Sequence, residues 1–242
     1  MITLPLCLIP MITQALVLAG GLGTRLRPLT TTVPKPMVPV RGRPFLEHIL
    51  EYLKTNKVKR AVISVGYLSE KISSHFGDGS DLGLELSYSD EGSPKGTGFG
   101  VRHAREFLDN EFFILYGDSY LPISLKELYS SYSSHPKSFG IICVYSNKKG
   151  EFSNNVVVDK TGRVLLYDKK TPNPKMNGVE AGISIFKKTV LDVIPDKVPC
   201  SFETETYPLL IKKKSLFAFT TNTRFYDIGS FAGLDEAKVA IK

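Results

Sequence analysis

A glycine-rich segment with nearby positive charge is the part of the sequence best suited to chemistry. The stretch Gly20-Gly21-Leu22-Gly23 directly follows an apolar run, and Arg25 and Lys35 come soon after it. Glycines let the backbone approach a phosphate closely and present its N–H groups as an anion cradle. Pro34 and Pro36 stiffen the chain on both sides of Lys35. A triphosphate requires this combination of close amide donors and fixed cations.

Three other interpretations of this loop are weaker. A dinucleotide-binding fingerprint would need a third glycine where the chain has Leu26, and a P-loop would need glycine and lysine together at the loop's end. An ordinary turn between a strand and a helix would explain two glycines. It would not explain the arginine, the lysine and the prolines that accompany them.

Two aspartates are candidate metal ligands. Asp118 comes after the apolar run 112–115 in Gly117-Asp118, and Asp227 lies in Tyr226-Asp227-Ile228-Gly229. A carboxylate at the carboxyl end of a parallel strand lies where ligands bind in open α/β sheets. Two carboxylates can hold Mg²⁺ while substrate phosphates and water complete its octahedron. Either aspartate taken alone is also compatible with the capping of a turn.

The elements that must position these residues alternate between strand and helix in the first half of the chain. Apolar runs predict strands at 14–19, 60–65, 84–88 and 111–116. Helices are predicted from Pro44 as first helical residue, over 69–76, and from the glycine-rich turn 96–100 through 108. This alternation indicates a mostly parallel sheet with crossover helices.

The second half has a more mixed pattern with short connections. Strands are predicted at 138–144, 155–159, 164–168, 181–186, 215–220 and 225–228. A helix is predicted over 202–213, and Ser230 is a candidate cap for a last helix. Because no internal repeat, low-complexity tract or long linker interrupts the chain, we predict one α/β domain over residues 11–242. We interpret residues 1–10 as an N-terminal extension that precedes the native start at Met11.

Composition narrows the classes of partner. The chain of 242 residues is 42% hydrophobic, with a net charge of +7 and a pI near 9.2. No aromatic-basic motif or recognition helix accompanies the basic residues, so we expect no nucleic-acid partner, and small polyanions or a solvated surface explain the charge equally well. Three widely spaced cysteines without a CxxC pair fit a reducing, cytoplasmic location. No apolar stretch is long enough to predict a membrane span.

From Gly20 to Val40 the chain resembles, almost residue for residue, the signature of the sugar-phosphate nucleotidyltransferases, GGxGTRLxPLTxxxPKPMxPV. The resemblance extends over nearly the whole chain from Gln14, and its general pattern is similar to guanylyltransferases for mannose 1-phosphate or manno-heptose 1-phosphate. It implies a three-layer α/β/α, Rossmann-like (GT-A-like) fold with a mixed, mostly parallel central sheet. It also implies a Mg²⁺-dependent enzyme that joins a nucleoside triphosphate to a sugar 1-phosphate and releases pyrophosphate.

The resemblance assigns roles to positions of this chain. It implies four catalytic residues, of which the two aspartates bind Mg²⁺: Arg25, Lys35, Asp118 and Asp227. It implies a nucleotide site made by Ala19, Gly20, Gly21, Gly23, Thr24, Arg25, Gly96 and Thr97. It implies a sugar-phosphate site made by Asn154, Asp168, Lys169, Glu180 and Gly182. Thr97 is also a candidate cap of the following helix.

Departures from the family pattern concern the sugar rather than the reaction. Glu180 stands where the family has asparagine, Asp168 where it has glutamate, and Asn154 where relatives usually have glycine. Pro122 stands where many members carry an acidic residue. A glutamate that faces a sugar can accept hydrogen bonds from hydroxyl groups and would repel an acidic sugar.

Several alternatives remain open from the sequence. GTP is the expected triphosphate, and UTP, dTTP and CTP are not excluded, since members that share this fold use different bases. A non-catalytic regulatory subunit that binds a nucleotide sugar is a second possibility. A glycosyltransferase would usually carry a D-x-D motif where this chain has Asp118-Ser119-Tyr120. The chain shows no hexapeptide repeats, and the pattern leaves a homo-oligomer open.

Overall fold

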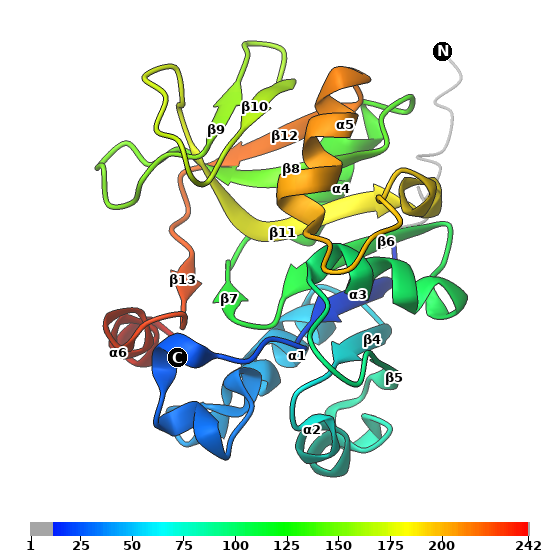
Figure 1. Ribbon diagram of the computed structural model, residues 1–242, viewed down its shortest axis with the longest axis vertical. Coiled ribbons are helices and arrows are strands. Elements are labelled where there is room, and N and C mark those ends of the chain that lie inside the picture. Colours follow the sequence, from blue (N-terminus) through cyan, green and yellow to red (C-terminus); the bar gives the residue numbers. More distant parts are fainter. Residues whose placement is uncertain (1–11, 242) are drawn as a thin grey trace, which may run out of the picture.

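Seven strands form one sheet at the centre of the computed structural model, which describes residues 12–241 (Figure 1). Their order across the sheet is β12-β8-β11-β6-β1-β4-β5. The bounds are β1 Gln14–Leu18, β4 Arg60–Val65, β5 Glu85–Asp90, β6 Glu111–Tyr116, β8 Gly140–Tyr145, β11 Val179–Lys187 and β12 Leu216–Thr221. The interpretation of residues 1–10 as an extension lies outside the described residues.

Strand β11 is the one strand of this sheet that runs against its neighbours. It pairs antiparallel with β6 and β8, whereas β1 pairs parallel with β4 and β6, β4 with β5, and β8 with β12. The sheet is therefore mixed and mostly parallel, as predicted. Its central strands are buried along almost their whole length, which continuous apolar runs indicate for a sheet that is covered on both faces.

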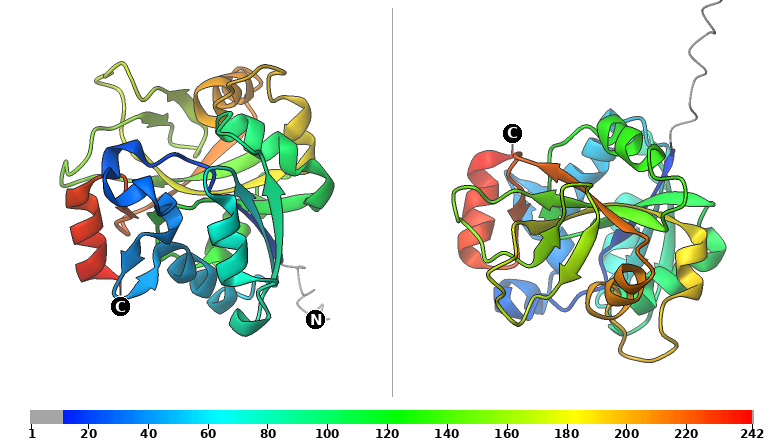
Figure 2. Two further views of the ribbon diagram at one scale, coloured as in Figure 1. Left: turned by 60° about the horizontal axis from the view of Figure 1, so that its bottom comes forward. Right: turned by 90° about the horizontal axis from the view of Figure 1, so that it is seen from above.

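Helices cover both faces, so the predicted three-layer arrangement is confirmed (Figures 1 and 2). One buried cluster holds side chains of α1 Phe45–Thr55, α2 Ser69–Phe76, α4 Leu125–Ser133 and α6 Phe231–Ala240. The other holds side chains of α3 Thr97–His103, α5 Tyr207–Lys212 and the hairpin β9 Val156–Val158 and β10 Val164–Tyr167. Alternate residues of each strand enter alternate clusters: Ala15 and Val17 join the first and Leu16 the second.

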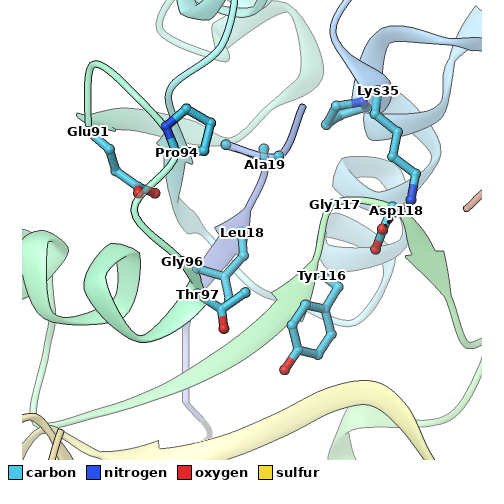
Figure 3. Close-up of a pocket in the computed structure, with 13 residues that line it drawn as sticks. Leu18, Ala19, Lys35, Glu91, Pro94, Gly96, Thr97, Tyr116, Gly117 and Asp118 are labelled. Carbon is cyan, nitrogen blue, oxygen red and sulfur yellow. Dashed lines mark hydrogen bonds and ion pairs between the residues drawn. The ribbon is translucent and has the colours of Figure 1, made fainter. Parts of the chain in front are cut away.

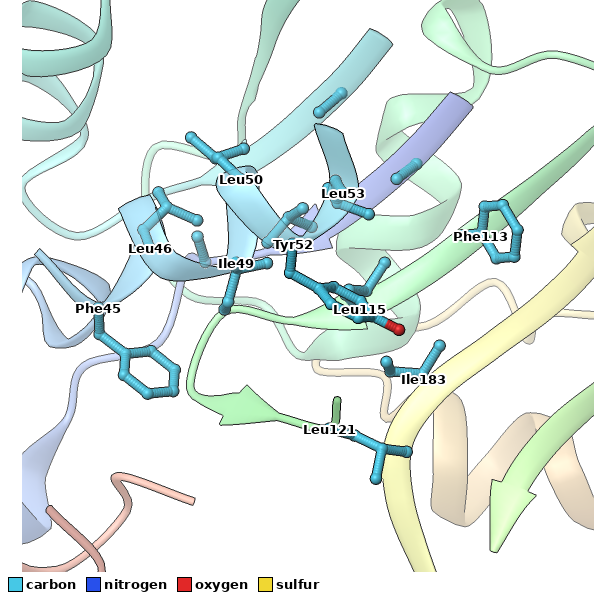
Figure 4. Packing of buried hydrophobic residues seen from close by; sticks show 14 of the residues in the cluster. Phe45, Leu46, Ile49, Leu50, Tyr52, Leu53, Phe113, Leu115, Leu121 and Ile183 are labelled. Atoms are coloured by element: carbon cyan, nitrogen blue, oxygen red, sulfur yellow. The ribbon is translucent and has the colours of Figure 1, made fainter. Parts of the chain in front are cut away.

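Helix α1 illustrates how the first face is packed. Its apolar side chains recur with helical spacing, and the buried cluster that they enter also holds Phe113 and Leu115 of β6 and Ile183 of β11 (Figure 4). The prediction of Pro44 as the first helical residue is wrong, because Pro44 is the N-cap, with an extended ψ of 139°. The helix begins one residue later, and the amide of Phe45 donates to the carbonyl of Val38 at 3.1 Å.

Other differences from the predicted elements are local. Helix α4 was not predicted, and the predicted helix 202–213 is a π-helical turn, Phe202–Thr206, followed by α5. The third helix ends at His103 and continues as a 3₁₀ turn, Ala104–Phe107. The cap prediction for α6 is confirmed, since Ser230 Oγ accepts from the amide of Gly233 at 3.1 Å. Among the described helices, none has the length and apolar character needed to cross a membrane.

Two small antiparallel ladders complete the fold. One joins β2 Pro39–Val40 to β3 Arg43–Pro44, just before α1. The other joins β7 Ser119–Tyr120, which follows β6, to β13 Tyr226–Asp227, which precedes α6. The second ladder lies beside the edge at which β1, β4 and β6 end. It therefore brings a segment from the end of the chain to the glycine-rich loop (Figure 1).

Candidate active site

The glycine-rich loop leaves β1 at Leu18 and folds as three short 3₁₀ turns, Thr24–Leu26, Leu29–Thr31 and Lys35–Met37. Gly23 has a φ of 62°, a conformation that favours glycine, and a Cβ at this position would lie only 3.0 Å from Cβ of Lys35. The observed conformation of the loop therefore requires glycine at residue 23. The hydroxyl of Thr30 donates to the carbonyl of Gly23 at 2.7 Å. The loop thus folds back on itself and brings Lys35 towards the sheet edge.

Two cavities adjoin at this edge. The first has a volume of about 180 Å³ and is lined by Ala19, Gly20, Gly21, Lys35 and other residues of the loop, β6 and the start of α3 (Figure 3). The second has a volume of about 780 Å³ and includes Arg25, Lys169, Glu180, Gly182 and Asp227. Both cavities are lined by Gly96, Thr97, Tyr116 and Asp118. Because these residues are shared, the cavities form one continuous site.

Lys35 and Asp118 meet where the two cavities join. Nζ of Lys35 donates to Oδ2 of Asp118 at 2.5 Å, and Lys35 is 8% exposed (Figure 3). Asp118 follows β6 after Gly117, at the carboxyl end of a parallel strand. Lys35 comes from the loop after β1 and Asp118 from the end of the neighbouring strand β6, so the fold creates this contact.

Asp227 reaches Asp118 through the β7–β13 ladder. Asp227 pairs with Ser119, and the amide of Ile228 donates to the carbonyl of Asp118 at 3.0 Å. Burial raises the pKa of Asp227, and the charge of Asp118 raises it further, whereas Lys35 and Arg25 lower it. Arg25 also lies against Gly229, since a Cβ on that glycine would be 2.6 Å from Nη2 of Arg25.

This carboxylate pair fits a hard divalent cation. No group of three or more acidic, histidine or cysteine residues that could hold a metal occurs among residues 12–241. Mg²⁺ does not need one, because it is usually bound by one or two carboxylates plus substrate phosphates and water. The pKa of Asp227 is raised partly by the like charge of Asp118, which a cation between them would offset. The donor set is therefore compatible with the predicted Mg²⁺ site.

The sugar side of the site is shaped by a β-bulge in β11. The register of β11 with β8 shifts between Glu180 and Ser184, and Gly182 has a φ of 84°. The amide of Gly182 donates to Oε1 of Glu180 at 2.9 Å, which folds the carboxylate back onto its own strand. Burial raises the pKa of Glu180 to about 7; Lys169 lowers it, whereas Glu203 and Asp118 add to the increase.

Four predicted site residues do not line either cavity. Gly23 and Thr24 form the turn of the loop. The amide group of Asn154 accepts from Nδ2 of Asn147 at 2.7 Å and donates to the carbonyl of Met176 at 3.1 Å. Oδ1 of Asp168 accepts from the amides of Lys170 and Thr171, at 2.7 and 3.1 Å. Their assignment to substrates stays a prediction.

Glu203 is the residue of this site that the sequence interpretation overlooked most clearly. It is 5% exposed, and its Oε2 accepts from Thr97 Oγ1 and Ser201 Oγ, both at 2.8 Å. Its Oε1 accepts from the hydroxyl of Tyr116. The cap interpretation of Thr97 is therefore wrong, because Thr97 is the first residue of α3 and its hydroxyl binds Glu203. The sequence around residue 203 gives no signal that it lies beside Thr97.

Further cavity residues were also missed, among them Asn155, Arg224 and Glu91. Asn155 lines the second cavity, and its Oδ1 accepts from the amide of Glu180 at 2.9 Å. Arg224 forms ion pairs with Glu236 at 2.7 Å and Glu151 at 3.4 Å. Its guanidinium lies over the rings of Phe152 and Tyr226, 5.3 and 5.1 Å from their centroids. Glu91 lines the first cavity. Only the tertiary fold brings these side chains together.

Comparisons with known proteins show which family and which fold this chain matches. A family model described as "Nucleotidyl transferase" matches residues 14–242. Mannose-1-phosphate guanylyltransferase of Mycobacterium tuberculosis is 34% identical over 199 residues, which is 82% of this chain and 55% of that protein. The D-glycero-alpha-D-manno-heptose 1-phosphate guanylyltransferase of Campylobacter jejuni is 33% identical over 221 residues, which is 89% of this chain and 94% of that protein. This chain thus spans only about half the length of the mycobacterial relative.

Solved structures show the same fold. HddC from Yersinia pseudotuberculosis, 26% identical, matches with a TM-score of 0.79 over 96% of this chain and 100% of that one. A second structure of that protein, complexed with GMP-PN, matches with a TM-score of 0.78 over the same shares. A UDP-glucose pyrophosphorylase complexed with UDP-glucose has a TM-score of 0.79 at 21% identity over 95% of this chain and 98% of that one. At that identity the likeness concerns the fold alone.

Proposed function

Because this chain belongs to the nucleotidyl transferase family, we propose that it joins GTP to mannose 1-phosphate or a manno-heptose 1-phosphate and releases pyrophosphate. The observation that carries the proposal is the meeting of Arg25 and Lys35 with Asp118 and Asp227 in one continuous site. These residues supply the cations and carboxylates that a Mg²⁺-bound triphosphate requires. A UTP-, dTTP- or CTP-using enzyme of the same class is the alternative.

The chemistry needs no general base. The attacking oxygen belongs to the phosphate of the sugar 1-phosphate and is already an anion. It attacks the α-phosphorus in line, and pyrophosphate leaves from the opposite side. Catalysis then depends on positioning and on neutralisation of charge at the phosphates.

Each charged residue has a role in this scheme. The amides of Gly20 and Gly21 and the guanidinium of Arg25 bind the triphosphate and the leaving pyrophosphate. Lys35 neutralises charge at the α-phosphate, and Lys169 holds the sugar phosphate against repulsion from the triphosphate. Asp118 and Asp227 would hold Mg²⁺, which neutralises phosphate oxygens and orients them when it is bound.

Support for the substrates comes from the relatives' names. Two relatives that this chain matches over most of its length are named for mannose 1-phosphate and manno-heptose 1-phosphate. One matching solved structure, that of HddC, is a complex with GMP-PN. The sugar pocket carries Glu180, which is compatible with a neutral, hydroxyl-rich sugar.

A substrate matrix tests the proposal. Pyrophosphate release would be measured with GTP, UTP, dTTP, CTP and ATP, each combined with mannose, manno-heptose or glucose 1-phosphate and Mg²⁺. We expect the highest kcat/KM for GTP with a manno-configured sugar. Tight binding of a nucleotide sugar without pyrophosphate release from any pair would indicate a regulatory subunit and refute the proposal.

A further inference from the structure

One part of the second cavity lies between helix α6 and the β8–β9 loop, residues 146–155 (Figure 2). The loop lines the cavity here with Glu151 and Phe152, and α6 lines it with Gly233 and Glu236. These two walls belong to elements that are far apart in the sequence. A contact between them therefore sets the shape of the cavity at this place.

Arg224 provides this contact. Its Nη2 donates to Oε2 of Glu236 at 2.7 Å, and its Nε lies 3.4 Å from Oε2 of Glu151. Its guanidinium also lies over the rings of Phe152 and Tyr226. One planar cation thus contacts the β8–β9 loop, α6 and β13 at once, because the guanidinium can bind carboxylates at its edge while its face lies against aromatic rings.

The β8–β9 loop connects this contact to the sugar pocket. Phe152 stacks on Phe225 with ring centroids 4.5 Å apart, and its backbone exchanges two hydrogen bonds with the side chain of Asn147. The loop ends at Asn155, whose Oδ1 accepts from the amide of Glu180 at 2.9 Å. A displacement of the loop would therefore reach Glu180 in the wall of the sugar pocket.

The positive charge of Arg224 is offset within its own group of contacts. Two carboxylates, Glu151 and Glu236, lie beside it, so the group as a whole carries no positive charge. The same three side chains also line a surface cavity of about 720 Å³. They therefore form a partition between the second cavity and the surface. This arrangement suits a structural tie better than a binding site for phosphate.

We propose that Arg224 is a positioning residue for the sugar: it ties the β8–β9 loop to α6 and so fixes one wall of the sugar pocket. This inference deepens the proposed function and rests on it. Ion pairs near the surface contribute little to stability, so loss of Arg224 should change the pocket more than the fold. A nucleotide in the first cavity, which Arg224 does not line, should be unaffected.

Binding of one nucleotide with and without its sugar isolates this part of the site from catalysis. Dissociation constants of GDP and GDP-mannose would be measured by isothermal titration calorimetry with Mg²⁺ for the wild type, Arg224→Gln, Glu236→Gln and the double variant. Their ratio within one variant reports on the sugar pocket, and a partly unfolded preparation does not change it. Arg105→Gln is the matched control, because Arg105 also forms an ion pair at 2.7 Å, with Asp192, and lines neither cavity.

We expect Arg224→Gln to lower the preference for GDP-mannose over GDP by about fivefold to twentyfold, a size typical of coupled contacts. Glu236→Gln should lower the preference as well. The double variant should be no worse than Arg224→Gln, because both single changes break the same contact. The affinity for GDP should stay at the wild-type value in every variant, and Arg105→Gln should match the wild type throughout.

The sign of the Glu236→Gln effect separates a tie from a direct charge. A higher preference for GDP-mannose in Glu236→Gln would show that Arg224 acts on the ligand by its charge, which Glu236 then no longer offsets. Additive losses in the double variant would show that the two side chains contact the sugar separately. Either result overturns the inference, as does an unchanged preference in Arg224→Gln.

Failure of the inference can be told apart from failure of the proposed function. The results just described require that the wild type binds GDP-mannose, and they leave the proposed substrates intact. A wild type that binds neither GDP nor GDP-mannose would refute the proposed substrates and this inference together. Pyrophosphate release with any other pair of substrates would then still support the reaction class.

Discussion

Lys35 and Asp118 are 83 residues apart in the sequence, yet their charged groups are 2.5 Å apart. Asp227 joins them through a ladder of two short strands. Each of these side chains is partly or fully withdrawn from water, so its charge acts at a lower effective dielectric constant than in solution. Single substitutions here should therefore change the reaction rate far more than the fold.

Replacing Asp118 by Asn should lower kcat by at least about 10²–10³, the usual loss when a group that stabilises transition-state charge is removed. Arg25→Ala and Lys35→Ala should cause losses of the same order. Folding should persist, because the hydrogen bond from Ile228 uses the backbone carbonyl of residue 118. Pyrophosphate release at saturating substrate and urea unfolding would measure the two effects.

Asp235→Asn is a suitable control for these variants, because Asp235 lies on α6 and, among residues 12–241, pairs only with Lys238, at 2.9 Å. It should retain full activity. Turnover of Asp118→Asn near the wild-type rate would remove the assignment of this residue as a metal ligand.

Glu180 should make stability depend on pH. Its pKa is raised from 4.5 to about 7 in the folded chain, so the native state keeps a proton that the unfolded state releases. The free energy of unfolding should therefore fall as the pH rises from about 5 to 8, by roughly 3 kcal/mol at most. Lys169 opposes this effect, while Glu203 and Asp118 add to it.

Urea denaturation of the wild type and Glu180→Gln at pH 5 and pH 8 measures this dependence. The glutamine variant cannot ionise, so its stability relative to the wild type should increase with pH. Equal pH slopes in the two proteins would show that Glu180 titrates normally.

At the scale of elements, the bulge in β11 positions the sugar side of the site. It turns Gly182 into a conformation that favours glycine and places Glu180 in the cavity wall. Strand β11 runs antiparallel to both of its neighbours, β6 and β8. A change that straightens this strand would move both residues.

Gly182→Ala should destabilise the protein more than Gly42→Ala. Both glycines have similar φ values, 84° and 81°, so both substitutions carry the strain of a positive φ. A Cβ added at residue 182 would lie 2.9 Å from Cβ of Ser119, which is too close. A Cβ added at residue 42 would have no neighbouring atom of the described chain within 4 Å. We expect roughly 1–3 kcal/mol of additional loss, measured by urea unfolding.

The same pair of variants separates effects on the site from effects on stability. Gly182→Ala should raise the KM for the sugar phosphate, whereas Gly42→Ala should leave it unchanged. Equal losses of stability in the two variants would show that β11 moves easily to accommodate a methyl group.

Elements with strong periodicity were predictable from the sequence, and elements defined by tertiary contacts were not. The strands Arg60–Val65 and Glu111–Tyr116 and the helix Ser69–Phe76 were predicted with their observed bounds. The signal for helix α4 was weak, because only Leu125, Leu128 and Tyr132 of its nine residues are buried. Its N-cap, Ser124, accepts from the amide of Glu127 at 3.3 Å, a capping pattern that the sequence interpretation overlooked.

At the scale of the whole molecule, the site is lined by residues from Leu18 to Glu236, so a ligand connects most of the chain. Mg²⁺ with GTP at a hundred times its dissociation constant should stabilise the fold by about 2.7 kcal/mol. For a protein of this size that corresponds to a Tm increase of about 5–10 °C.

Differential scanning fluorimetry with and without EDTA measures this increase. Chelation of the metal should remove most of it, because the triphosphate then loses its link to Asp118 and Asp227. A Tm that rises equally in EDTA would show that the carboxylates do not bind the nucleotide's metal.

The signature loop and the aspartates are recognisable from the sequence alone, because each stands in a local pattern that phosphate or metal chemistry explains. Glu91 and Glu203 are not recognisable in this way. Glu91 accepts a hydrogen bond from Ser64, and Glu203 accepts from Thr97 and Tyr116, and these donors lie far away in the sequence. The opposite holds for Asn154 and Asp168. Both stand at motif positions of the family, but their side chains form hydrogen bonds elsewhere in the chain and line neither cavity.

The pairing of β13 with β7 has a consequence for how the protein is synthesised. A nascent chain that has emerged only as far as β12 already contains the phosphate loop, Asp118 and the sheet, but Asp227 is still inside the ribosome. The second carboxylate reaches its partner only after residues 119–227 have also been translated. A chain that stops just before residue 227 would therefore contain all seven strands of the central sheet and the first carboxylate, and would lack the second.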